Sequence, residues 1–398
     1  MSISRSRRTQ GAVALVLVGS LAAAACGSSK SATPAATTAK AGTVTTAAPA
    51  AVTTVAAGAA TTAAPVKTGS KVGVSLILKN TSNAFFVAMQ KEAQASADKI
   101  GVSLTVAAGT KDGDTATQIT AIENAVSKGD KGILITPNGD DVVPAIKKAR
   151  DAGLLVIALD TPPNPASSVD ITFATDNYLA GQLIGKWAAA QLGGAKATIA
   201  MLDLFNDKVV SVDTARDQGF LNGMGIVAKE DKSANGKEPS SGKYTGGKGG
   251  DYAVVCHEPT QGATDGGKTA METCLSKNPG VNVVYTINEP AAGGAFAALK
   301  AAGKEKGVLI VSVDGGCNPG LKLVADGTIG ATAQQYPGKM ASLGMQAIKD
   351  LADGKAKPAV SSGLDFFNTG VALVTDKKVD GLDSISVADG SKICWGAA

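Results

Sequence analysis

Three polar residues that could bind a ligand stand at the ends of apolar runs typical of buried strands: Asp160, Asn288 and Asp314. A carboxylate directly after a buried strand costs free energy unless it is paired or faces a ligand. Turn formation would also explain such residues. Arg216, in a segment with helical periodicity, could donate two hydrogen bonds to oxygen atoms of a ligand, or could lie on the surface. Together these side chains favour a binding site for a polar molecule.

Alternating apolar runs and helical patterns position these residues. Continuous apolar runs such as 154–159 indicate strands that are buried on both faces, as in parallel sheets. The pattern predicts an α/β fold with two doubly wound parallel-sheet domains and a cleft at the carboxyl ends of the strands. Strands are expected at 72–78, 103–107, 132–136, 154–159, 169–174, 198–202, 252–256, 282–286, 308–313, 329–333 and 371–375, with helices between most of them. Residues 229–251 show no apolar period and are predicted to form a surface insertion.

Several strand-end motifs carry a resemblance to a known family. Asn83-Ala84-Phe85-Phe86 matches an Asn-Pro-Phe-Phe pattern apart from Ala84, Arg216–Phe220 matches Arg-x-x-Gly-Phe, and Tyr336-Pro337 follows Gln335. On these motifs, residues 71–375 resemble the ribose- and fructose-type periplasmic sugar-binding proteins of ABC importers. The resemblance implies a type I periplasmic binding protein fold, in which a multi-strand hinge joins the two domains.

The resemblance also implies the residues of the site. Phe85 and Phe86 would stack on the apolar face of a sugar ring, or pack in the core of the first helix. The side chains expected to bond the sugar hydroxyls are those of Asn83, Asp160, Arg216, Asn288, Asp314 and Gln335. Asp176 or Asn177 is expected to cap the helix at 177–192, and Glu289 could cap the helix that follows it. Fructose is the first expectation for the sugar, followed by ribose, another hexose or a polyol.

The expected domain boundaries follow from these patterns. A signal peptide at 1–25 precedes Cys26 and a disordered Ala/Thr-rich tether at 27–70. The N-terminal lobe is expected at 71–174 plus 336–365, and the C-terminal lobe at 175–335 plus 366–398.

The N-terminal segment predicts export and lipidation. Arg5, Arg7 and Arg8 precede 15 apolar or small residues at 11–25, which are too few to span a membrane comfortably but suit a secretory signal. The run ends at Cys26-Gly27, as in bacterial lipoprotein signals, although an ordinary cleaved signal remains the alternative. We therefore expect an exported protein held at the outer face of the cell membrane by a lipid on Cys26.

Charge and cysteine content limit the partners. The formal charge of +4 falls to −2 for residues 71–398, because residues 1–70 hold six cations and no acid. A near-neutral folded region argues against nucleic-acid binding. Four cysteines beyond Cys26 allow three pairings or four free thiols, and we expect Cys256–Cys274 and Cys317–Cys394. No metal site is predicted, because the sequence has no C-x-x-C pair and His257, its only histidine, is expected on the surface.

Other functions are less well supported. Gly262–Thr269 matches the phosphate-loop pattern, but Pro259 and further residues separate it from the preceding strand. Asp160 and Asp314 could in principle flank a glycosidic bond, yet no complete catalytic motif accompanies them. The resemblance therefore implies a binding protein that delivers a monosaccharide to a membrane permease, and we expect it to be monomeric, non-enzymatic and without a cofactor. A sugar sensor for a membrane receptor would have the same fold and site.

Lipidation can be tested at Cys26. Replacing Cys26 with Ala removes the thiol that would carry the lipid, so the variant should leave the membrane fraction. Fractionation of cells that express the wild type or the variant measures this. Membrane retention of the Cys26→Ala protein would contradict the predicted anchor.

Overall fold

The computed structural model describes residues 72–227 and 235–396. The expected signal peptide, the lipidation site Cys26 and the tether at 27–70 lie outside these residues. Among the described helices, none combines the length and the apolar character that a membrane crossing needs.

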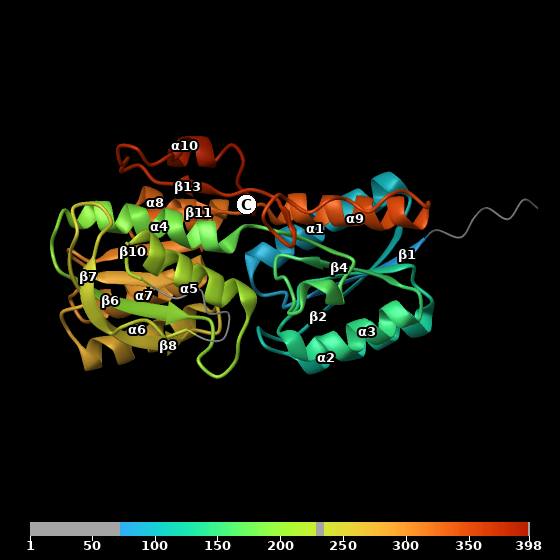
Figure 1. Ribbon diagram of the computed structural model, residues 1–398, viewed down its shortest axis with the longest axis horizontal. Coiled ribbons are helices and arrows are strands. Elements are labelled where there is room, and N and C mark those ends of the chain that lie inside the picture. Colours follow the sequence, from blue (N-terminus) through green and yellow to red (C-terminus); the bar gives the residue numbers. More distant parts are fainter. Residues whose placement is uncertain (1–71, 228–234, 397–398) are drawn as a thin grey trace, which may run out of the picture. The chain divides into compact units, whose positions relative to one another are not determined.

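The first sheet contains six parallel strands in the order β12-β5-β4-β3-β1-β2 (Figure 1). Its elements are β1 (Gly73–Leu78), α1 (Ala84–Ile100), β2 (Ser103–Ala108), α2 (Thr115–Lys128), β3 (Gly132–Ile135), α3 (Val143–Asp151), β4 (Leu155–Leu159), β5 (Ile171–Ala174), α9 (Pro337–Ala352) and β12 (Phe367–Asn368). Helices α1 and α9 pack together over one face, and α2 and α3 cover the other. Apolar side chains therefore lie on both faces of the strands, which explains their continuous apolar sequences.

The second sheet contains seven strands in the order β13-β11-β10-β9-β6-β8-β7. Its elements are α4 (Asn177–Leu192), β6 (Ala197–Asp203), α5 (Ser211–Gly223), β7 (Ser241–Tyr244), β8 (Gly250–Pro259), α6 (Thr264–Lys277), β9 (Val283–Thr286), α7 (Glu289–Ala301), β10 (Leu309–Asp314), α8 (Lys322–Ala325), β11 (Ala331–Gln334), β13 (Ala372–Val374) and α10 (Val387–Gly390). Only the edge strands β7 and β13 run antiparallel to their neighbours. Helices α4 and α5 cover one face, and α6 and α7 cover the other. The predicted doubly wound α/β fold is confirmed.

Three chain segments connect the two sheets: β5 to α4, β11 to α9, and β12 to β13. Two of these segments are hydrogen-bonded side by side, since the backbone N–H of Thr369 donates to the carbonyl oxygen of Ala174 at 2.8 Å. The Lys339 ammonium, one turn into α9, donates to the carbonyl oxygen of Thr369 at 2.8 Å. The expected boundary at 366 lies slightly too early, because Phe367 still pairs with Phe173 in the first sheet.

The structure corrects two expected elements. Part of the insertion expected at 229–251 forms β7, an antiparallel partner of β8, and its Tyr244 is buried with the hydroxyl donating to the carbonyl oxygen of Ala195. Residues 229–234 of this insertion lie outside the described residues. The helix expected at 209–227 is shorter, Ser211–Gly223. Strand β7 forms because it pairs with the edge strand β8 and buries Tyr244. Neither feature produces a regular apolar pattern in the sequence.

Two disulfides join the cysteines as expected. Cys256 on β8 is bonded to Cys274 on α6, and Cys317 after β10 is bonded to Cys394 near the C-terminus. Closing loops of 18 and 77 residues stabilises the folded state by roughly 3 to 4 kcal/mol each in the chain-entropy model. The second bond fixes the C-terminal segment against the end of β10.

Helices α4 and α5 touch through their backbones because each carries two glycines four residues apart. A Cβ atom added to Gly185 would lie 2.2 Å from the carbonyl oxygen of Phe220, and one added to Gly219 would lie 2.2 Å from that of Tyr178. Real Cβ atoms do not approach a carbonyl oxygen this closely, so any side chain would push the helices apart. This contact sets the position of α5, which carries Arg216.

The Gly185→Ala variant tests this helix contact. The added methyl group should force α4 away from α5 and lower the free energy of unfolding by about 1–3 kcal/mol. Gly293→Ala is the matched control, since a Cβ there meets nothing within 4 Å inside helix α7. The control should raise the free energy of unfolding by up to about 1 kcal/mol through better helix propensity. Urea unfolding measures both, and shifts of the same sign would argue against the close contact.

Candidate functional site

A cavity lies where the carboxyl ends of strands from both sheets meet. It is lined from the first sheet by Lys79, Asn83, Phe85, Phe86, Asp112 and Asp160, and from the second by Leu204, Val212, Arg216, Ile287, Asn288 and Asp314. Seven of the eight predicted ligand residues therefore line one cavity. The exception is Gln335, which lies behind it and donates from Nε2 to Oδ1 of Asp314 at 2.7 Å.

An aromatic group closes one side of the cavity. The Phe85 and Phe86 rings meet edge to face with centroids 5.3 Å apart, and both side chains are buried. Asn83 caps α1 by accepting from the backbone N–H of Phe85 at 2.9 Å. Trp395, from the C-terminal segment, packs edge to face on Phe85 at 5.3 Å and donates from Nε1 to the carbonyl oxygen of Gln335. The Phe85-Phe86 pair thus serves both as a wall of the cavity and as part of the core.

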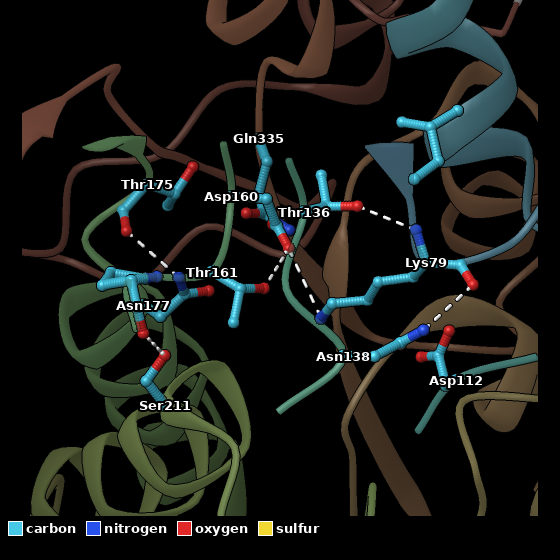
Figure 2. Close-up of polar contacts among 12 residues, drawn as sticks. Lys79, Asp112, Thr136, Asn138, Asp160, Thr161, Thr175, Asn177, Ser211 and Gln335 are labelled. Atoms are coloured by element: carbon cyan, nitrogen blue, oxygen red, sulfur yellow. Dashed lines mark hydrogen bonds and ion pairs between the residues drawn. The ribbon is translucent and has the colours of Figure 1, made fainter. Parts of the chain in front are cut away.

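Lys79 and Asp160 form a buried ion pair on the first sheet, with 3.7 Å between Nζ and Oδ2 (Figure 2). The backbone of Lys79 is held on both sides, because its N–H donates to Oγ1 of Thr136 and its carbonyl oxygen accepts from Nδ2 of Asn138. Thr161 donates from its hydroxyl to Oδ2 of Asp160 at 2.7 Å. Asp160 is therefore anchored by a cation and a hydroxyl, as a carboxylate at a buried strand end requires.

Arg216, on helix α5, is the cation that lines the cavity from the second half of the molecule. Its Nε donates to Oδ1 of Asn177 at 2.7 Å, and its Nη1 donates to the carbonyl oxygen of Ile287 at 2.8 Å. The same Nη1 lies 3.6 Å from Oδ1 of Asp314. Burial raises the pKa of Asp314 to about 7, although the charge of Arg216 acts in the opposite direction. The guanidinium is thus oriented by neutral acceptors, with Asp314 beside it.

Asn288, rather than Glu289, caps helix α7. Asn288 lines the cavity but also caps α7, since its Oδ1 accepts from the backbone N–H of Ala291. Glu289 does not cap the helix; its buried carboxylate accepts from the backbone N–H of Gly315 and from the hydroxyl of Thr332. Burial and the charge of Asp314 raise the pKa of Glu289 to about 8. Glu289 therefore supports the loop after β10 from behind.

Of the two predicted caps of helix α4, Asp176 is the one that caps it, since its Oδ1 accepts from the backbone N–H of Leu179. Asn177 instead orients Arg216, as described above. The two residues are neighbours in sequence. Asn177 differs from Asp176 in role because α5 brings Arg216 within hydrogen-bond distance of it.

Sequence reasoning missed Lys79, Asp112 and Trp395. Lys79 directly follows β1, so the strand-end argument used for Asp160 would have found it. Asp112 lies in the loop after β2, accepts from Nδ2 of Asn80, and has its pKa raised by burial. Nothing local to Asp112 or Trp395 indicates these positions, because long-range contacts bring Asp112 to the cavity and Trp395 to Phe85, which lines it.

The backbone is strained at both central carboxylates. Asp160 has a φ of 65° and directly follows β4, and Asp314 has a φ of 127° and is the last residue of β10. Aspartate tolerates the left-handed region better than most residues, but a φ of 127° costs on the order of 1–3 kcal/mol. Such strain is concentrated where a side chain must be aimed at a site.

Comparison with known proteins identifies related sequences. A family model described as "Periplasmic binding protein domain" matches residues 74–356. The ribose import binding protein of Salmonella typhimurium strain LT2 is 27% identical over 289 residues, covering 72% of this chain and 86% of that protein. The D-apiose import binding protein of Actinobacillus succinogenes is 28% identical over 263 residues, covering 66% and 76%.

A solved structure agrees with these sequence matches. An ABC transporter solute-binding protein from Agrobacterium vitis with bound D-fucose has a TM-score of 0.65 at 25% identity, with 81% of this chain and 99% of that chain covered.

The pKa of Asp314 predicts a pH dependence of stability. The folded state holds this proton up to about pH 7, whereas an unfolded chain releases it near 3.8, so the folded state binds more protons between these values. The free energy of unfolding should therefore fall as the pH rises through this window, and Asp314→Asn should reduce that fall. Urea unfolding at several pH values measures it.

Asp151→Asn is the control, because the Asp151 side chain is 63% exposed and forms an ion pair with Lys147 one turn away. This variant should keep the pH dependence of the wild type. An Asp314→Asn protein with the wild-type pH dependence would contradict the raised pKa.

Proposed function

Because the chain belongs to the periplasmic binding protein family, we propose that it is the substrate-binding component of an ABC importer with a monosaccharide as ligand. The observation that carries the proposal is the shared cavity, in which charged and amide side chains from both sheets surround a phenylalanine pair. The relatives described above are named as import binding proteins for ribose and D-apiose. These names are those of binding proteins and agree with the expected absence of catalysis.

The proposed ligand fits the chemistry of the cavity. A sugar has an apolar C–H face that a phenyl ring can cover and hydroxyls that both donate and accept hydrogen bonds. Asp160 and Asp314 would accept from hydroxyls, and Lys79 and Arg216 would donate to them. Each buried hydroxyl without a partner costs about 1–3 kcal/mol, so the arrangement of these groups would select the sugar.

We interpret the structure as a closed arrangement of the cleft, on two observations. The cavity is only about 30 Å³, which admits roughly one or two water molecules. Ser211, at the start of α5, donates from its hydroxyl to the carbonyl oxygen of Pro162 at 2.6 Å. This hydrogen bond joins the half of the molecule built on the second sheet to the half built on the first. We infer that the halves separate at the three connecting segments to admit a sugar. The sugar would then shift the population toward closure through contacts with both halves.

The expected domain division, 71–174 plus 336–365 and 175–335 plus 366–398, is kept in this proposal with the second boundary moved beyond Asn368. Family membership implies export. Within the proposal, Cys26 carries the lipid anchor, a membrane permease receives the sugar, and the protein acts as a monomer.

A panel of sugars tests the proposal and its finer part, the identity of the ligand. Fructose is the first candidate from the sequence resemblance, and ribose, allose, apiose, fucose and myo-inositol are the comparison ligands. Isothermal titration calorimetry with the purified protein should detect saturable binding of at least one of them, without turnover. Asp160→Asn should weaken that binding by about 10- to 100-fold, because it removes a charged acceptor of sugar hydroxyls.

Asp151→Asn again serves as the control and should bind like the wild type. Absence of binding to every monosaccharide and polyol would overturn the proposed ligand class. Binding with wild-type affinity by Asp160→Asn would remove this carboxylate from the site, and release of a chemically altered sugar would favour an enzyme.

A further inference from the structure

A second group of ionisable side chains lies away from the sugar cavity, on the face of the second sheet that α5 covers. Asp203 is the last residue of β6, Asp217 lies in α5, and His257 lies in β8. One potential ligand atom of each lies within 4.8 Å of the others. None of the three lines the cavity described above. His257 is the only histidine of the chain, and it is not on the surface as the sequence suggested.

The sheet register brings these residues together. Met201 pairs with His257 on β8 and with Tyr285 on β9, so the side chains of all three point to the same face. Asp203 follows Met201 by two residues and shares this face. Asp217 projects onto this face from α5, one turn before Phe220. The rings of Phe220 and Tyr285 pack together with their centroids 5.2 Å apart. Two strands and one helix thus contribute to the cluster, and Tyr285 of a third strand lies on the same face.

The imidazole of His257 is oriented as in metal sites. Its Nε2 lies 2.6 Å from Oε1 of Glu238, while its Nδ1 lies 2.7 Å from Oδ2 of Asp203 and 3.8 Å from Oδ2 of Asp217. A histidine that binds a metal usually donates its other ring N–H to a carboxylate, which fixes the tautomer. Glu238 fills that role, so the lone pair of Nδ1 can face both aspartates.

Buried oxygen atoms around the cluster lack hydrogen-bond partners among the described residues. They are both carboxylate oxygens of Asp217, Oδ1 of Asp203 and the hydroxyl oxygen of Tyr285. Tyr285 is fully buried, and burial together with the charges of Asp213, Asp203 and Asp217 raises its pKa well above the usual value. Burial also raises the pKa of Asp217. Buried oxygens without partners are costly, and a cation between them would satisfy them.

We propose that Asp203, Asp217 and His257 bind a divalent transition-metal ion of the Zn²⁺ type, with Glu238 as the positioning residue of His257. One imidazole and two carboxylates are ligands that Zn²⁺ accepts, whereas Ca²⁺ takes oxygen ligands. Asp213 is not a ligand, because its two oxygens accept from the backbone N–H groups of Leu204 and Phe205.

A proton competes with the metal for the same position. Nδ1 of His257 and Oδ2 of Asp203 lie 2.7 Å apart, a hydrogen-bond distance, so a proton lies between them in the metal-free protein. The metal would bond to Nδ1 and release this proton to solvent. The ion would tie α5 to β6 and β8 immediately beside Arg216, and it would raise the stability of the second half.

Nitrogen NMR of the single histidine tests the site directly. Untagged protein labelled with ¹⁵N-histidine and treated with a chelator gives signals from one imidazole. Both nitrogens should be protonated without metal. Stoichiometric Zn²⁺ should move the Nδ1 signal to a metal-bound position, while Nε2 stays protonated. Signals that excess Zn²⁺ leaves unchanged would overturn the proposal and leave a protonated histidine between two carboxylates.

Calorimetric titration of Zn²⁺, Mn²⁺ and Ca²⁺ identifies the ion and its ligands. Asp217→Asn should lower the Zn²⁺ affinity by about 100-fold or more, and Glu238→Gln by about 10- to 100-fold. Asp251→Asn, an exposed residue on the same strand as His257, is the matched control and should bind Zn²⁺ like the wild type. Unchanged Zn²⁺ binding by Asp217→Asn, or a preference for Ca²⁺, would contradict the assigned ligands. Should Asp217→Asn fail to fold, the wild-type NMR titration decides alone.

Discussion

Compensation of buried charge is the constraint on which the cleft depends. Lys79 and Arg216 are both nearly inaccessible to solvent, and each lies against the carboxylate of a strand-end aspartate. A buried ion without a partner would cost several kcal/mol, so each cation requires its carboxylate. Burial raises the pKa of a third carboxylate, Asp112. Under the proposed function, the same groups would exchange these partners for the hydroxyls of a sugar, because each hydroxyl both donates and accepts hydrogen bonds.

The scaffold is built to keep those partners in place. Asp160 and Asp314 stand at positive φ, a conformation that persists only where surrounding structure holds it. Thr161 and Gln335 bond the two carboxylates from the side, and Glu289 supports the loop after β10. The close packing of α4 against α5 fixes the axis from which Arg216 projects. Rigid support of this kind reduces the entropy that a binding site loses when it closes on its ligand.

Helix α5 links the two ionisable clusters of the second half. Arg216 and Asp217 are adjacent, and successive residues of an α-helix point about 100° apart. Arg216 therefore faces the cleft while Asp217 faces His257 and Asp203. A change in the position or charge of the side chains in either cluster therefore acts on helix α5. This arrangement gives a physical route by which the state of one cluster can influence the other.

The sequence by itself determined the alternation of strands and helices, and through it the two-sheet fold. It also placed Asp160, Asn288 and Asp314 at strand ends, because parallel strands end at one edge and local apolar patterns mark where each strand stops. Tertiary structure alone decided the pairing of Lys79 with Asp160, the arrival of Trp395 behind Phe85, and the enclosure of His257 by carboxylates. These three contacts depend on sheet order, helix packing and the meeting of residues far apart in the chain. Such features produce no local periodic pattern in the sequence from which they could be predicted.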